Sequence, residues 1–274
     1  YQQYKNYQRR QATYAFYRAN LTDKTSPNVR ILSDTFLVDY LNERRTLRIY
    51  LPDDYENSTS RYPVIYLFDG QALFNDIVNK EPEWRVDEVI DSVTTAGGPA
   101  AIVVGIDNHG THRSAEYNPY LTQEEYREIN GKQHADWVVN NLKPWIDTSY
   151  RTLPDPQYTV VGGASLGGLM SYYMLMTYPT VFQRAIVFSP SFWADESLFH
   201  LHKEMVDIDK VKIYMNIGAE EGYPMKPHAK KMARLLGKAG LGEDQLKFTV
   251  VPKQGHWHIT WRKGFAEAYP WIIE

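Results

Sequence analysis

The chain has 274 residues, enough to bury a large core within one α/β domain. With 43% hydrophobic and 23% charged residues it has an ordinary globular composition, and its net charge of −3 gives no electrostatic reason to bind nucleic acid or an anionic membrane. The lack of cysteine excludes disulfides, thiolate metal ligands and a cysteine nucleophile. No apolar run reaches the length of about 18 residues that a transmembrane helix needs, and the composition selects neither a cytoplasmic nor a secreted location.

Residues 1–28 are polar, rich in tyrosine and without clean periodicity. They predict a surface helix or an arm packed on the domain, with a dimer arm, and hence a homo-oligomer, as the alternative. From Val29 onward the pattern becomes strand-like. Residues 28–41 and 45–52 predict two antiparallel strands around a turn at Asn42 and Glu43.

Six short apolar runs follow, and each predicts a buried strand: 64–68, 100–107, 158–163, 184–190, 211–218 and 247–252. Helical patterns lie between them, for example at 84–93, 134–146, 169–178 and 227–240. Strands that alternate with helices predict a parallel sheet with helices on both faces. Because no repeat or low-complexity linker interrupts the series, we predict one α/β domain over residues 29–274, with substrate loops at the carboxyl ends of the strands.

One serine lies at a junction typical of a catalytic nucleophile. Gly163-Ala164-Ser165-Leu166-Gly167 fits the pattern Gly-x-Ser-x-Gly, follows an apolar run and opens a helical one. Strand, tight turn and helix form a nucleophile elbow, in which the glycines leave room for a strained backbone at the serine. The helix N-terminus directs free N–H groups towards developing negative charge. The alternative is a serine that caps a helix after a glycine turn.

A serine nucleophile needs a base, and an α/β-hydrolase supplies its triad in the order Ser, Asp or Glu, His. Of the histidines after the serine, His256 and His258 directly follow the last predicted strand, so one of these two is the candidate base. The acid should follow the strand before that, where Glu220 and Glu221 stand side by side. Asp195, after an earlier strand, is a weaker candidate.

Several longer stretches resemble one known family. They are YPVIYLFDGQALF, VVGIDNHGTHRSAEYNP, LKPWIDTSYRTLPD, VVGGASLGGLMSYYMLMTYPTVFQRAIVFSPSFW and GHWHITWRKGF, and they extend the resemblance from about Val29 to the C-terminus. The chain is similar to the putative-esterase family of α/β-hydrolases, which includes enterochelin esterases, esterase D, feruloyl and acetyl-xylan esterases and mycolyltransferases. The resemblance implies an α/β-hydrolase fold, with a mostly parallel central sheet and helices on both faces, and a serine esterase that acts through an acyl-enzyme.

The family pattern implies roles for individual residues. Family members commonly carry Gly-His with a tryptophan five residues after the histidine, which Gly255-His256 and Trp261 match, so the resemblance assigns the base to His256. It assigns the acid to Glu221, the third residue after the glycine that ends the preceding strand, where many members have aspartate. The chain departs from the pattern at Trp257, where members often have aspartate.

An acyl-transfer site also needs N–H donors for the oxygen of its tetrahedral intermediate. One is expected from the backbone of Leu166, the residue after the serine. The second should come from the loop after the strand at 64–68, and the resemblance assigns it to the backbone N–H of Gln71, with Gly70 allowing close approach. Without the serine motif, Asp69-Gly70 would be interpreted as a simple turn.

Candidate substrate contacts lie in HRSAEYNPY, where the family often has Arg-x-x-Glu-Tyr. Arg113 is a candidate for substrate binding, and the alternative is a structural ion pair with Glu116 that holds the loop. Tyr117 and Trp193 are candidates for an aromatic wall against a sugar or aryl group, although aromatic side chains more often pack in a core.

Asp107, His109 and His112 are the candidate ligands of a metal site. The two histidines have ligand-like spacing, but no further compact cluster supports them, so we expect a solvated loop and neither a metal nor another cofactor.

The predicted function is hydrolysis of a soluble carboxylic ester, with a sugar-linked acetyl or feruloyl ester as the leading substrate. A siderophore trilactone and transfer of the acyl group to an alcohol are the alternatives. A non-catalytic binding module is disfavoured because serine, acid and histidine are all present in the right order. The expected partner is therefore a small-molecule or carbohydrate ester, and not nucleic acid or a membrane.

Overall fold

The computed structural model describes residues 2–120, 129–204 and 207–274. Its centre is an eight-stranded sheet in the order β1-β2-β4-β3-β5-β6-β7-β8. The strands are β1 (Val29–Val38), β2 (Glu43–Tyr50), β3 (Val64–Phe68), β4 (Ile102–Ile106), β5 (Thr159–Ala164), β6 (Arg184–Phe188), β7 (Lys212–Gly218) and β8 (Leu246–Val251). β1 and β2 form an antiparallel hairpin, β2 pairs antiparallel with β4, and the remaining pairs are parallel. The predicted α/β-hydrolase fold is confirmed.

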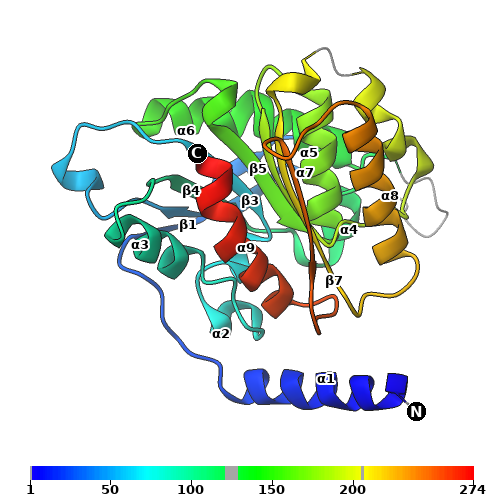
Figure 1. The fold of residues 1–274 in the computed structure, drawn as a ribbon. Coiled ribbons are helices and arrows are strands. Elements are labelled where there is room, and N and C mark those ends of the chain that lie inside the picture. The colour runs from blue at the N-terminus through cyan, green and yellow to red at the C-terminus, as the bar shows by residue number, and fades with distance from the viewer. Residues whose placement is uncertain (1, 121–128, 205–206) are drawn as a thin grey trace.

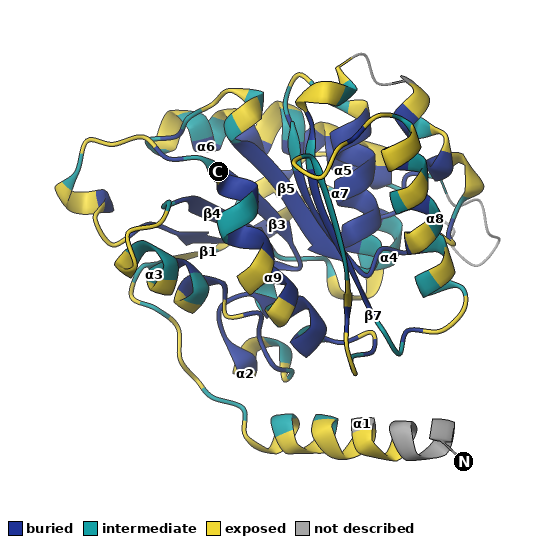
Figure 2. Cartoon of the chain, in the orientation of Figure 1, coloured by how far each residue is buried: buried dark blue, intermediate teal, exposed yellow. Residues whose placement is uncertain are grey.

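The central strands are buried at nearly every residue, as Figure 2 shows, because helices cover both faces of the sheet. Successive side chains point to opposite faces, so Tyr66 and Phe68 join one core cluster while Ile65 and Leu67 join the other. This two-sided burial explains why each central strand is a continuous apolar run in the sequence.

Helices lie on both sides of the sheet (Figure 1). α3 (Val86–Thr95) and α9 (His258–Ile273) pack together in one core cluster, and α5 (Gly131–Trp137), α6 (Lys143–Ser149), α7 (Leu166–Thr177) and α8 (Met225–Lys238) contribute to the other. α5 continues into α6 through a π-helical turn, and the short α2 (Asp76–Asn79) and α4 (Arg113–Glu116) lie in loops after β3 and β4. Across the described part of the chain, every helix is too short or too polar to cross a membrane.

The N-terminal helix α1 (Gln2–Ala19) belongs to neither helical layer of the sheet (Figure 1), and most of its described side chains are exposed. Residues 20–28 then lead into β1 without helix or strand. Tyr14 and Tyr17 pack on Trp257, with ring centroids 3.8 and 5.6 Å away. The predicted N-terminal helix is therefore present, while its alternative role as a dimer arm stays a prediction.

Candidate active site

Ser165 connects β5 to α7 with φ 60° and ψ −120°. This conformation is uncommon for a residue with a side chain and is the strained turn of a nucleophile elbow. A Cβ atom at position 163 would lie 2.7 Å from the backbone of Gly167, so Gly163 is required by the close approach of the two segments. The predicted sequence of strand, turn and helix is confirmed around this serine.

Hydrogen bonds connect Ser165, His256 and Glu221 in a chain. His256 follows β8, and its Nε2 is 3.0 Å from Oγ of Ser165. Its Nδ1 is 2.8 Å from Oε2 of Glu221, which follows β7. Because an ionised carboxylate only accepts hydrogen bonds, we assign the imidazole proton to Nδ1, which leaves Nε2 to accept from the serine hydroxyl. This is the tautomer that a general base requires.

Glu221 is buried, and both of its oxygens have partners. Oε1 accepts hydrogen bonds from the Ser189 hydroxyl at 2.6 Å and from the Gly218 backbone N–H at 2.8 Å. Oγ of Ser189 in turn accepts from the indole N–H of Trp261 at 3.0 Å. These donors stabilise the buried carboxylate and direct its other oxygen to His256. Ser189 was not predicted, although its place directly after β6, at the carboxyl edge of the sheet, is a signal for it.

The alternatives that sequence position left open lie outside this chain of hydrogen bonds. Glu220 pairs with Arg9 of α1. His258 begins α9 and packs on Trp261, with ring centroids 4.9 Å apart. Burial lowers the pKa of His258 to about 4, so its ring is neutral at neutral pH. Asp195 caps a short 3-10 turn in its own loop, where its carboxylate accepts a hydrogen bond from the backbone N–H of Ser197 at 2.7 Å.

The two predicted oxyanion donors come from two segments, the start of α7 and the loop after β3. Leu166 is the first residue of α7, so its N–H has no acceptor within its own helix. Gln71 lies in a 3-10 turn after β3 and lines the same pocket as Ser165. A Cβ atom at Gly70 would lie 2.6 Å from a carboxylate oxygen of Asp107, so this turn accommodates only glycine there.

Asp69 anchors the loop that carries Gln71, in a left-handed conformation with φ 60° and ψ 47°. Its carboxylate accepts two hydrogen bonds from Arg113, at 2.6 and 2.7 Å, and one from Asn108 at 2.7 Å. Its backbone N–H donates to the Tyr117 hydroxyl at 3.2 Å. Asn108 was not predicted, because a contact between residues 39 positions apart leaves no local pattern.

Two interpretations of the loop after β4 were wrong. Tyr117 does not form an aromatic wall, because its side chain is 0% exposed and lies under the Asp69 loop. Arg113 does not pair with Glu116 either. Arg113 pairs with Asp69 and lines the pocket, while Glu116 is buried against Arg45. Both charges have an ion-pair partner distant in sequence, and contact of Arg113 with the substrate stays a prediction.

Two further candidates lie outside the pocket lining. Trp193 follows β6 and is 45% exposed, but it is not among the described residues that line the pocket, so its contact with substrate stays a prediction. The carboxylate of Asp107 accepts two hydrogen bonds from Arg48, at 2.8 and 2.9 Å, and His109 pairs with Glu43. Among the described residues, no group of three possible metal ligands includes Asp107, His109 or His112.

The site opens into a pocket of about 310 Å³. Its lining comprises Asp69, Gln71, Ala72, Asn79, Trp84, Asn108, Arg113, Ser165, His256, His258 and Trp261. Trp84 and Trp261 pack together with ring centroids 5.9 Å apart and supply an apolar wall, while Arg113 and Asn108 supply polar groups. The sequence analysis placed Trp84 in a predicted helix and did not identify it as a residue of the site. The volume suits an acyl group of moderate size.

The strand order, the elbow at Ser165 and the position of the pocket at the carboxyl ends of the strands are those of an α/β-hydrolase. A comparison with family models agrees, since the model described as "Putative esterase" matches residues 39–272. The chain belongs to this family. Carboxylic ester hydrolysis is therefore its class of reaction.

Individual relatives are distant. The chain is 26% identical over 241 residues to the uncharacterized protein YbbA of Bacillus subtilis, which covers 83% of this chain and 92% of YbbA. It is 27% identical over 252 residues to the ferri-bacillibactin esterase BesA of the same organism, and the match covers 80% of this chain and 81% of BesA. Among solved structures, a ferulic acid esterase superposes with a TM-score of 0.71 over 90% of this chain and 98% of that one, at 19% identity. That structural likeness shows the fold alone.

Proposed function

We propose that the protein is a serine esterase that hydrolyses a soluble carboxylic ester through an acyl-enzyme on Ser165. The observation that carries the proposal is the chain of hydrogen bonds from Oγ of Ser165 through His256 to Glu221. A serine hydroxyl by itself is a weak nucleophile, and an adjacent histidine of the correct tautomer activates it.

In the acylation step, Oγ of Ser165 attacks the carbonyl carbon of the ester while Nε2 of His256 takes the hydroxyl proton. Glu221 stabilises the imidazolium that results. The former carbonyl oxygen becomes an oxyanion, and the backbone N–H groups of Leu166 and Gln71 donate hydrogen bonds to it. When the intermediate collapses, the bond to the alcohol breaks and the alcohol leaves with the proton from His256.

In the deacylation step, a water molecule attacks the acyl group while His256 takes one of its protons. Collapse of the second intermediate releases the carboxylic acid and returns the proton to Oγ of Ser165. The side chain of His256 is 38% exposed, so water has access to it. The same access admits an alcohol in place of water, which makes acyl transfer the alternative fate of the acyl-enzyme.

For the substrate, we propose a small acyl group on a polar alcohol, with a sugar-linked acetyl or feruloyl ester as the leading class. A pocket of about 310 Å³ has room for an acetyl group or for one aromatic ring against Trp84 and Trp261. Arg113 and Asn108 offer donors to polar substituents. A siderophore trilactone is the second candidate, because BesA, named a ferri-bacillibactin esterase, aligns with 80% of this chain.

Two experiments test this proposal. Ser165→Ala should lose at least about 10³-fold in kcat on a soluble aryl acetate and should no longer react with a covalent serine probe, while thermal unfolding shows that it folds. A folded variant that keeps more than about a tenth of the activity would exclude Ser165 as the nucleophile. A panel of acetylated sugars, feruloyl esters and catecholate trilactones, compared by kcat/KM, ranks the substrates. Product analysis with added sugar acceptor separates hydrolysis from transfer.

A further inference from the structure

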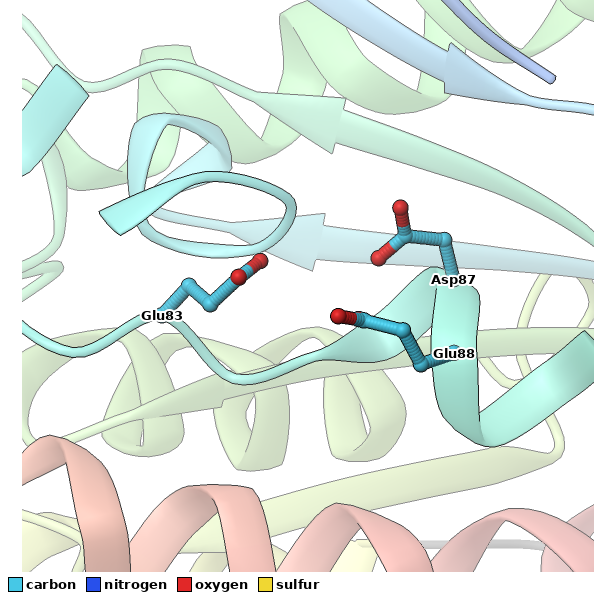
Figure 3. A group of neighbouring side chains, drawn as sticks. All are labelled: Glu83, Asp87 and Glu88. Atoms are coloured by element: carbon cyan, nitrogen blue, oxygen red, sulfur yellow. The ribbon is translucent and has the colours of Figure 1, made fainter. Parts of the chain in front are cut away.

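Three acidic side chains converge where the loop before α3 meets the helix (Figure 3). Glu83 lies in the loop, and Asp87 and Glu88 lie in the first turn of α3. Each offers a carboxylate oxygen, and these oxygens all lie within 4.8 Å of one another. Glu83 is 1% exposed and Asp87 2% exposed, whereas Glu88 is exposed. The cluster is therefore buried at one end and open to solvent at the other.

Each of the two buried carboxylates of this cluster has one oxygen without a hydrogen-bond partner among the described residues. Among the residues that the structure describes, Oε2 of Glu83 is buried without a hydrogen-bond partner. Oδ1 of Asp87 is also buried without a partner, while Oδ2 accepts a hydrogen bond from the backbone N–H of Ser26 at 3.0 Å. Buried acceptors of this kind are strongly disfavoured unless a donor or a cation compensates them.

The arginine beside the cluster has other partners. Nε of Arg262 donates to the backbone carbonyl of Glu83 at 2.7 Å, and its Nη2 lies 3.5 Å from the carboxylate of Asp76. The positive end of the α3 dipole favours acidic residues in the first turn, but Glu83 precedes the helix. Arg262 therefore lies near the cluster, but neither of these contacts goes to one of the three carboxylates.

We propose that Glu83, Asp87 and Glu88 form a binding site for a hard divalent cation, and for Ca²⁺ in the first place. Carboxylate oxygens are the ligands that Ca²⁺ prefers, at about 2.3–2.6 Å, so one ion bridges oxygens up to about 4.6–5.2 Å apart. Three carboxylate oxygens within 4.8 Å of one another fit around one such ion. Water on the exposed side, beside Glu88, completes the coordination, and the ion compensates the unpaired oxygens of Glu83 and Asp87.

The proposed ion has a structural role. Glu83 directly precedes Trp84, which lines the catalytic pocket and packs on Trp261. Asp87 holds Ser26, in the segment that leads from α1 into the sheet. A bound cation therefore joins the loop before α3 to the first turn of α3, behind one wall of the pocket. It takes no part in the ester chemistry, so we expect it to raise the melting temperature and to leave kcat unchanged.

Direct binding measurements test the site. The full chain, treated with EDTA and desalted, is titrated with Ca²⁺ and Mg²⁺ by calorimetry and with Tb³⁺ by luminescence sensitised through Trp84. We expect one ion per chain, with a Ca²⁺ dissociation constant of about 0.1–1 mM, the range of weak oxygen-ligand sites. The melting temperature should rise with Ca²⁺, because an ion that binds only the folded state stabilises it.

Single-residue variants separate a cation site from a cluster that shares protons. Glu88→Gln removes an exposed ligand, Glu83→Gln replaces a buried one with an isostere, and each should weaken Ca²⁺ binding at least about tenfold. Glu243→Gln removes the same charge from the exposed loop between α8 and β8 and should bind like the wild type.

The proposal is overturned if the wild type shows no saturable binding of one ion up to roughly ten times the expected dissociation constant. It is also overturned if both cluster variants bind Ca²⁺ with the wild-type affinity. A third contradicting result is that Ca²⁺ changes the melting temperature of neither the wild type nor Glu83→Gln. The last result would mean that shared protons alone stabilise the carboxyl groups. None of these outcomes depends on the esterase assay, so they test the cation site separately from the proposed catalytic function.

Discussion

Replacing Glu221 with glutamine exchanges one carboxylate oxygen for an amide nitrogen and tests the hydrogen-bond chain directly. In the wild type, Oε1 accepts from the Ser189 hydroxyl and the Gly218 N–H, and Oε2 accepts from Nδ1 of His256. Glutamine has a single acceptor oxygen. That oxygen should take the Oε1 position, because the backbone N–H of Gly218 can only donate. The amide NH₂ is then directed at Nδ1 of His256.

An NH₂ group that donates to Nδ1 holds the His256 imidazole in the opposite tautomer, with its proton on Nε2 and directed at Ser165. In that tautomer the ring cannot take the serine proton, and no carboxylate stabilises an imidazolium. We expect kcat to fall about 10³- to 10⁴-fold, equivalent to about 4–5 kcal/mol of transition-state stabilisation, with little change in KM.

The assay is hydrolysis of a soluble aryl acetate, with thermal unfolding to show that the variant folds. Glu220→Gln is the matched control, since Glu220 is the neighbouring residue but pairs with Arg9 of α1. Its kcat should change by less than about twofold, as expected for an ion pair at the surface. The reasoning would be refuted by a Glu221→Gln enzyme that keeps more than about a tenth of wild-type kcat, or by an equal loss in Glu220→Gln.

Three further predictions concern the histidines and metal dependence. His256→Ala should abolish nearly all activity, whereas His258→Ala should lose at most modest rate; the reverse pattern in kcat/KM would make His258 the base. Burial lowers the pKa of His258 and of His134 to about 4, whereas a histidine in an unfolded chain has a pKa of about 6.5. As pH falls from about 6.5 to 4, these histidines therefore take up protons in the unfolded state before they do so in the folded state. This lowers the free energy of unfolding over that pH range. Urea denaturation over this range should show a shallower fall for His258→Gln than for the wild type, and equal slopes would contradict the assignment. At temperatures below the melting temperature, EDTA should change kcat by less than about twofold, because the proposed chemistry uses no metal. Activity that is lost with EDTA and restored by a divalent ion would point to a catalytic metal at His109 and His112.

The fold could be predicted because its signals are local. A strand covered on both faces must be apolar at successive positions, and β3 to β6 meet this condition in the sequence as in the structure. The elbow at Ser165 is equally local, since five consecutive residues supply the end of a strand, the close glycine contact and the start of a helix. The boundary of the domain at residue 29 and the oligomeric state stay predictions.

Which side chains form the hydrogen-bond chain with Ser165 could be decided only from the tertiary structure. Glu220 and Glu221 are adjacent in one loop, and the hydrogen bonds of Gly218 and Ser189 select Glu221 as the partner of His256. His258 is two residues from His256, yet the start of α9 directs it into a different environment.

The loop after β4 shows the same limit. Arg113 and Tyr117 were both interpreted as substrate contacts from one sequence motif. In the structure, the guanidinium of Arg113 pairs with Asp69, which lies 44 residues earlier in the chain. The Asp69 loop also covers the side chain of Tyr117, which is buried. Sequence periodicity reports which face of an element is buried and where the chain turns, because those properties depend on neighbouring residues. The direction of a loop side chain and the partner of a buried charge depend on segments that meet only when the sheet assembles.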